Sequence, residues 1–142
     1  MAHERWRTMT DEECEQMLAG RHLGRVGLPE DGPPTILPVN YVVDDGWIVF
    51  RTDAGSKLDA AVTAARISFQ VDGVDEFNRT GWSVLVRGRV EEVRDEEQLA
   101  RLKELPLIPY APGAKEHYVR MRPDELSGRQ ISVVGLPSDW WG

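Results

Sequence analysis

The sequence has little of several features that define protein classes. It contains one cysteine, Cys14, which excludes an intrachain disulfide and makes a reducing cytoplasm the expected compartment. No apolar run reaches the length of a membrane span, and the charged amino terminus lacks the apolar stretch of a secretory signal. We therefore expect a cytoplasmic protein that does not interact with membranes.

Positive charge is also scarce. Lysine and arginine total 17 against 24 aspartates and glutamates, which gives a formal net charge of −7. This balance argues against a polybasic nucleic-acid surface, so no nucleic-acid partner is expected. The three histidines, His3, His22 and His117, are scattered along the chain. No spacing typical of metal ligands occurs, and no metal site is predicted.

A chain of 142 residues fits one compact domain spanning 1–142. Three short helices are predicted, because an N-cap residue is followed three positions later by a capping partner. These pairs are Thr10 with Glu13, Ser56 with Asp59, and Asp95 with Gln98. Cys14 would lie on the apolar face of the first helix, so it is predicted to be a core residue rather than a nucleophile.

The rest of the chain is rich in β-branched and aromatic runs. The segment 35–52 carries Asp45-Gly46 in its middle, which is a strong signal for a two-residue hairpin turn. Further strands are expected at 22–28, 67–71, 82–93, 117–121 and 129–136, with loops at 72–81 and 109–114 and a turn at 123–128. About six or seven mostly antiparallel strands with three short helices favour a small α+β, mainly β barrel over a doubly wound sheet.

The heptapeptide "RTDAGSK" at 51–57 is a candidate phosphate site. Arg51 ends a strand, Ser56 is the predicted helix N-cap, and Lys57 lies in the first helical turn, where a cation is unfavourable unless an anion is bound. Thr52 adds a hydroxyl, and Gly55 would allow close approach of a ligand. An ordinary strand–turn–helix with solvated charges is an equally good interpretation of the heptapeptide alone.

A two-residue turn at Asp45-Gly46 would pair Tyr41 with Phe50 and place Asn40 opposite Arg51 on one side of the sheet. The amide of Asn40 could read the polar edge of a flat heterocycle, or it could bond to neighbouring backbone. Trp82 is expected more as a core residue than as a cofactor platform. The aromatic pair Trp140 and Trp141 could cover a pocket or stabilise an oligomer.

The ordered set "PVNY", "GWIVFRT", "GSKLDAA", "FQVD" and "WSVLVRG" resembles the pyridoxamine 5′-phosphate oxidase-like family of FMN-binding split β-barrels. The resemblance extends from about Thr10 to Ile131 and is strongest to a small bacterial branch that includes nitroimidazole-resistance-like proteins. It implies a six- to seven-stranded antiparallel split barrel that forms a homodimer with the flavin at the interface. The phosphate segment lacks the doubled Arg-Lys of the vitamin-forming oxidase, having only Lys57 before Leu58, so oxidation of pyridoxamine phosphate is not expected.

The same resemblance assigns roles to individual residues. It places Pro38, Val39, Asn40 and Tyr41 along the isoalloxazine, Arg51, Thr52, Ser56 and Lys57 at the phosphate, and Trp82 and Ser83 on a strand that approaches the flavin. The expected function is that of an FMN-dependent oxidoreductase acting on an unknown small molecule, with no catalytic acid or base identified. A non-catalytic carrier of flavin, and a site for FAD or a deazaflavin, are the alternatives.

Overall fold

The computed structural model describes residues 3–53, 55–64, 66–107 and 117–134, excluding the side chains at positions 3–5, 57, 61, 63, 64, 133 and 134. The chain forms eight strands and three helices in these segments. In order they are β1 (His3–Thr8), α1 (Asp11–Ala19), β2 (Leu23–Leu28), β3 (Thr35–Asp44), β4 (Trp47–Thr52), α2 (Lys57–Ala64), β5 (Arg66–Asp75), β6 (Thr80–Glu92), α3 (Glu96–Leu102), β7 (His117–Met121) and β8 (Glu125–Val134).

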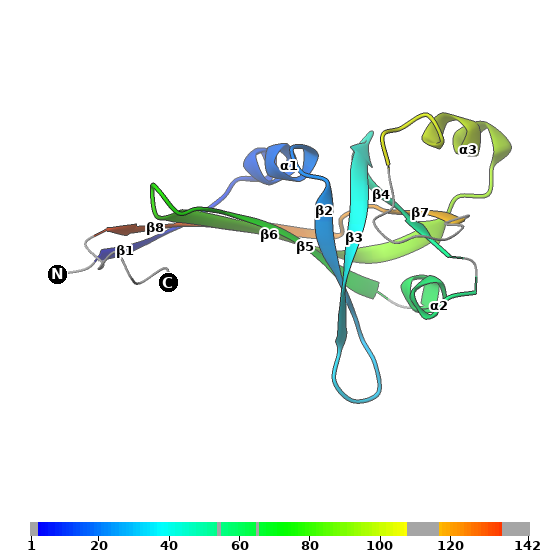
Figure 1. The fold of residues 1–142 in the computed structure, drawn as a ribbon, viewed down its shortest axis with the longest axis horizontal. Coiled ribbons are helices and arrows are strands. Elements are labelled where there is room, and N and C mark those ends of the chain that lie inside the picture. The colour runs from blue at the N-terminus through cyan, green and yellow to red at the C-terminus, as the bar shows by residue number, and fades with distance from the viewer. Residues whose placement is uncertain (1–2, 54, 65, 108–116, 135–142) are drawn as a thin grey trace.

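Six antiparallel strands close into a barrel. Their order is β6-β5-β2-β3-β4-β7, and the ring closes because the far end of β6 pairs with β7. β8 pairs with the other half of β6, and β1 pairs with β8. These two strands and the distal ends of β5 and β6 form an arm that projects from the barrel (Figure 1). The predicted split-barrel architecture with three short helices is confirmed.

Strand β3 belongs to both halves of the barrel. From Thr35 to Asn40 it pairs with β2, and from Tyr41 to Asp44 it pairs with β4. The predicted hairpin register is confirmed, because Tyr41 lies opposite Phe50. Asp45 has a φ of 49° and Gly46 a φ of 79°, as a tight hairpin turn of this type requires.

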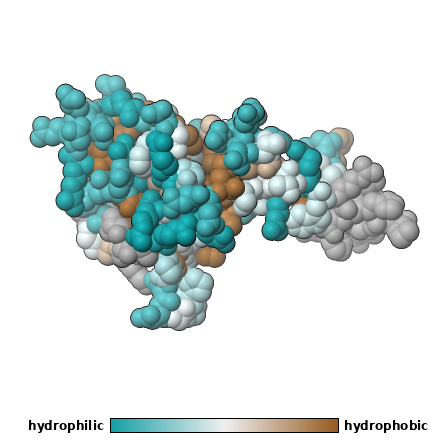
Figure 2. Space-filling view, turned by 180° about the vertical axis from the view of Figure 1, so that it is seen from behind, coloured by the Kyte–Doolittle hydropathy of each residue, from teal (hydrophilic) through white to brown (hydrophobic). Residues whose placement is uncertain are grey.

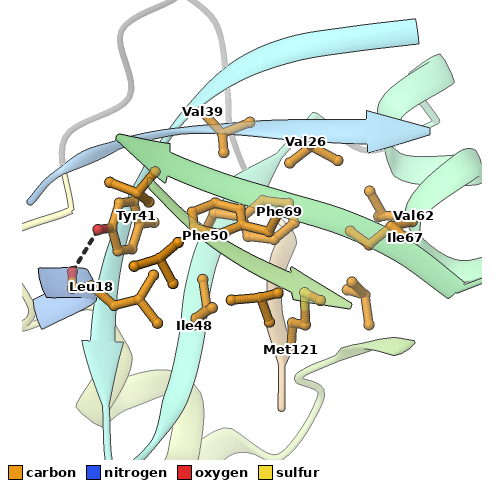
Figure 3. Packing of buried hydrophobic residues seen from close by; sticks show 14 of the residues in the cluster. Leu18, Val26, Val39, Tyr41, Ile48, Phe50, Val62, Ile67, Phe69 and Met121 are labelled. Atoms are coloured by element: carbon orange, nitrogen blue, oxygen red, sulfur yellow. Dashed lines mark hydrogen bonds between the residues drawn. The ribbon is translucent and has the colours of Figure 1, made fainter. Parts of the chain in front are cut away.

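The barrel interior is a continuous apolar cluster. Strand residues at alternating positions supply it, including Val26, Phe69, Val84 and Val86, each 0% exposed. Helix α1 covers one end of this cluster with Cys14 and Leu18 (Figure 3). The capping box predicted at Thr10 and Glu13 is present, and Cys14 is a core residue as expected.

Three segments differ from the sequence-based expectation. Residues 72–75 and 80–81, expected in a loop, extend β5 and β6 into the arm, and most of the expected turn at 123–128 belongs to β8. Gly73 lies within β5 because it faces Trp82, and a Cβ on it would come within 2.6 Å of the indole Nε1. Strand β1 was not predicted, because its charged sequence lacks the alternation of a half-buried strand.

None of the helices in the described segments is both long enough and apolar enough to cross a membrane. Trp140, Trp141 and the loop at 109–114 lie outside the described residues.

Two glycines on β2 provide a test of the packing. A methyl group at Gly24 would overlap the ring of Phe69 in the core, whereas one at Gly27 would meet Ser68 Cβ at an ordinary 3.6 Å. We expect Gly24→Ala to lower the free energy of unfolding by about 1–3 kcal/mol, because overpacking displaces a buried ring. Gly27→Ala is the matched control and should be neutral or slightly stabilising. Urea unfolding would measure both, and equal midpoints for the two variants would contradict this packing.

Candidate functional site

The candidate phosphate segment connects β4 to α2. Ser56 is the N-cap of α2, as predicted, because its Oγ accepts a hydrogen bond of 3.1 Å from the backbone N–H of Asp59. Gly55 has a φ of 73°, in the left-handed region that favours glycine. Among the residues that the structure describes, no atom lies within 4 Å of a Cβ built on Gly55, apart from its chain neighbours.

The carboxylate of Asp59 holds the segment together from within. Its Oδ1 accepts a hydrogen bond of 2.7 Å from the hydroxyl of Thr52, which is completely buried. Its Oδ2 accepts one of 3.2 Å from the backbone N–H of Gly55. Asp59 therefore links the end of β4, the loop and the first turn of α2.

Strand β7 adds a histidine to this group. His117 Nδ1 lies 3.0 Å from Asp59 Oδ1 and 3.7 Å from Glu92 Oε1. Burial raises the pKa of Asp59, but the hydrogen bonds from Thr52, His117 and Gly55 outweigh it and lower the pKa below its ordinary value. Asp59 is therefore ionised at neutral pH.

Arg51 and Asn40 lie on one face of the β3–β4 pair, and alternation along β4 turns Thr52 to the other face, towards Asp59 and His117. Arg51 pairs with Tyr118 on β7, and its guanidinium lies 5.1 Å from the centre of that ring. The β3–β4 ladder ends at Tyr41 and Phe50, so Asn40 pairs with Leu23 on β2 instead of facing Arg51 in the ladder. Alternation along the strands still places Asn40 and Arg51 on the same face, and both are half-buried.

The segment Pro38–Tyr41 divides between the surface and the core. Pro38 is exposed and Asn40 is half-buried, whereas Val39 and Tyr41 are buried. The hydroxyl of Tyr41 donates a hydrogen bond of 2.5 Å to the carbonyl of Leu18, and burial raises the pKa of Tyr41 to about 12 (Figure 3). Val39 and Tyr41 could thus contact a ligand only through their backbone.

Trp82 and Ser83 lie where the arm joins the barrel. They point to opposite faces of β6, and Trp82 shares the face of the core residue Val84. The guanidinium of Arg21 lies 5.2 Å from the centre of the Trp82 ring. Arg21 precedes His22, whose carbonyl accepts a hydrogen bond from the backbone N–H of Tyr41. Trp82 is therefore connected to the Pro38–Tyr41 segment through the Arg21–His22 connection.

The structure thus brings Thr52, Gly55, Ser56 and His117 together around Asp59, whereas Arg51 and Asn40 lie together on the other face of the β3–β4 pair. It places Trp82 and Ser83 near the start of β6, whereas only the far end of β6, Val90–Glu92, pairs with β7 beside β4 and Arg51. The side chain of Lys57 lies outside the described part of the chain. His117 and Arg21 were not predicted, because no local pattern indicates contacts with residues so distant in sequence; Asp59 was recognised only as a capping partner.

A separate cavity of about 1090 Å³ opens between α1, the β3–β4 hairpin and the start of β8. Leu18, Ile48 and Leu85 contribute apolar lining, and Arg87 and Arg122 contribute positive charge. None of the residues that the sequence nominated for the site lines it within the described segments. The cavity therefore gives no support to those assignments.

The group around Asp59 predicts a defined dependence of stability on pH. Because the folded-state pKa of Asp59 is lowered, its stabilising contribution is present above the unfolded-state pKa of about 4 and is lost as the pH falls through the folded-state value. We expect Asp59→Asn to reduce the free energy of unfolding by about 1–2 kcal/mol at neutral pH. The difference from the unmodified protein should shrink below about pH 4, as urea titrations at several pH values would show.

Asp72→Asn is the matched control, because Asp72 is exposed on β5 and bonds to Arg25 at the surface. It should change the free energy of unfolding little at any pH. A loss from Asp59→Asn that is the same at acid and neutral pH would contradict the role assigned to the ionised carboxylate.

Comparisons with known proteins agree with this fold. A family model described as pyridoxamine 5′-phosphate oxidase matches residues 10–130. The uncharacterised protein Rv0080 of Mycobacterium tuberculosis is 35% identical over 125 residues, which cover 84% of this chain and 82% of that protein.

Two solved structures have the same fold. An FAD-binding protein from Mycobacterium smegmatis is 34% identical, with a TM-score of 0.77 over 88% of this chain and 98% of the other. An FAD-binding protein from Mesorhizobium loti is 26% identical, with a TM-score of 0.72 over 92% and 99% of the two chains. Together with the closed barrel and its arm, these matches confirm the resemblance seen in the sequence. The chain belongs to the pyridoxamine 5′-phosphate oxidase-like family of split β-barrels.

Proposed function

We propose that this protein binds a flavin nucleotide and acts as a flavin-dependent oxidoreductase on a small molecule. The observation that carries the proposal is the segment from Arg51 to Lys57. It combines the half-buried Arg51, the N-cap hydroxyl of Ser56 and, beside Gly55, space that none of the described residues fills. A cation, a hydroxyl and the positive end of a helix suit a phosphate group. Membership of the family and the FAD-binding relatives support this choice of ligand.

The residues present fit such a ligand. Arg51, Ser56 and Lys57 would hold the phosphate, and the side chains of Pro38 and Asn40 with the backbone of Val39 and Tyr41 would contact the ring system. A bound flavin supplies the electron-transfer chemistry, and the protein supplies binding and orientation. A prominent catalytic acid or base is therefore not required of the chain.

We also propose that the site is completed by a second copy of the chain. In one copy, Trp82 and Ser83 lie near the start of β6, at the opposite end from the Val90–Glu92 segment that pairs with β7 next to β4. The molecule exposes large apolar side chains, with Trp6, Val74 and Phe77 exposed by 54%, 62% and 95%. Figure 2 shows apolar surface on one face between the barrel and the arm. A homodimer would cover such surface and could bring Trp82 of one copy towards the phosphate segment of the other.

The purified protein tests the proposal directly. We expect a flavin absorption spectrum, either as isolated or after FMN or FAD is added, and a mass of the extracted cofactor that identifies it. Reduction of the bound flavin by NADH or NADPH, with turnover of quinones or nitroaromatics, would support the oxidoreductase. A bound flavin that neither reductant reduces would support a carrier instead. A protein that stays colourless after both flavins are added would overturn the proposal.

The phosphate assignment predicts a large effect of two cations. We expect Arg51→Ala combined with Lys57→Ala to weaken flavin binding by about 2–4 kcal/mol, because each charge-assisted contact contributes about 1.5–3 kcal/mol and the two are not fully additive. The control Arg94→Ala removes an exposed arginine that pairs with Glu92 and should leave affinity nearly unchanged. Fluorescence titration would measure all three proteins, and equal affinities would place the phosphate elsewhere.

A further inference from the structure

The phosphate segment already contains a negative charge of its own. The ionised carboxylate of Asp59 lies in the first turn of α2, where the helix dipole favours an anion. Its Oδ2 is 3.2 Å from the backbone nitrogen of Gly55, and its own backbone N–H bonds to Ser56 Oγ. Any phosphate that contacts this loop would therefore lie close to a carboxylate.

The same contacts use several donors that an anion would otherwise take. The hydroxyl of Thr52 and the N–H of Gly55 donate to Asp59, and the N–H of Ser56 donates to the carbonyl of Asp53 at 3.1 Å. Recognition of a phosphate would then rest mainly on side chains, namely Arg51, Lys57 and the Ser56 hydroxyl. A phosphodiester presents two non-bridging oxygens that share one negative charge, whereas a phosphate monoester presents three terminal oxygens that share two. The small donor set of this loop suits the phosphodiester better.

We propose that Asp59 is a specificity-determining residue that makes this site prefer a phosphate with a single charge, such as either phosphate of the FAD pyrophosphate or a phosphodiester, over the doubly charged phosphate monoester of FMN. The inference rests on the proposed flavin function and adds the charge state of the ligand that the site accepts. It replaces FMN, the cofactor expected from the sequence, with a diester-type flavin. The physical cause is repulsion between two like charges in a partly desolvated loop.

Other charged groups surround Asp59 in the described part of the chain. His117 faces it from β7, Glu92 lies beyond His117 at the end of β6, and Arg51 and Asp53 lie on the adjoining strand end and loop. These groups act on every phosphate-bearing flavin, and the ratio of the FMN and FAD dissociation constants removes the part of their effect that the two flavins share. The ratio still changes when the FMN phosphate gains or loses its second charge, which happens near its second pKa of about 6.

The experiment measures the dissociation constants of FMN and FAD by flavin fluorescence at several pH values on both sides of 6. We expect the FMN-to-FAD ratio of dissociation constants to fall roughly tenfold as the pH drops through about 6, because FMN then loses its second charge. In Asp59→Asn the ratio should vary little with pH, and FMN should bind more tightly at alkaline pH than it does to the unmodified protein. Asp72→Asn should behave as the unmodified protein does.

The outcomes separate this inference from the proposed function. A ratio that does not change with pH in the unmodified protein would overturn the inference, whether or not Asp59→Asn folds. The same conclusion would follow if the folded Asp59→Asn variant, checked by circular dichroism, kept the pH dependence of the unmodified protein. By contrast, absence of any flavin affinity would refute the proposed function itself, whereas affinity that does not depend on Arg51 would place the phosphate elsewhere. Riboflavin, which lacks a phosphate, measures the contribution of the ring system alone.

Discussion

Closure of the barrel depends on β3 and β6, because each of these strands changes its pairing partner along its length. β3 leaves β2 after Asn40 and joins β4 at Tyr41, and β6 pairs with β5 and β8 along most of its length before it reaches β7. These two changes of partner enclose a single apolar core, with Tyr41 packed edge-on against Phe69 at a ring separation of 4.9 Å. A slip of one residue in either strand would turn core side chains towards the surface.

The same closure positions the candidate site. Because β4 pairs with both β3 and β7, its carboxyl end brings Arg51 next to Tyr118 and Thr52 next to His117. The short loop after Thr52 then delivers Asp59 to the buried Thr52 hydroxyl and to the imidazole of His117. One carboxylate thus links a strand end, a helix start and a second strand.

Local chemistry accounts for the parts of this arrangement that could be predicted. Two helix N-terminal caps lie within one helical turn each, namely Thr10 with Glu13 and Ser56 with Asp59. The hairpin turn is formed by the adjacent residues Asp45 and Gly46. Short-range geometry therefore determines both the caps and the turn. The arm was harder to foresee. The glycine at position 73 is normally a loop signal, yet here it makes room for the indole of Trp82 on the neighbouring strand.

The sequence by itself determined the helix starts, the hairpin register, the alternation that buries Val84 and Val86, and a family likeness carried by ordered segments. Only the tertiary structure decided that Tyr41 turns into the core, that Arg21 lies over Trp82, and that His117 meets Asp59. The physical reason is the range of the forces involved. Caps and turns depend on neighbours within about four residues, whereas these contacts join residues that only barrel closure brings together.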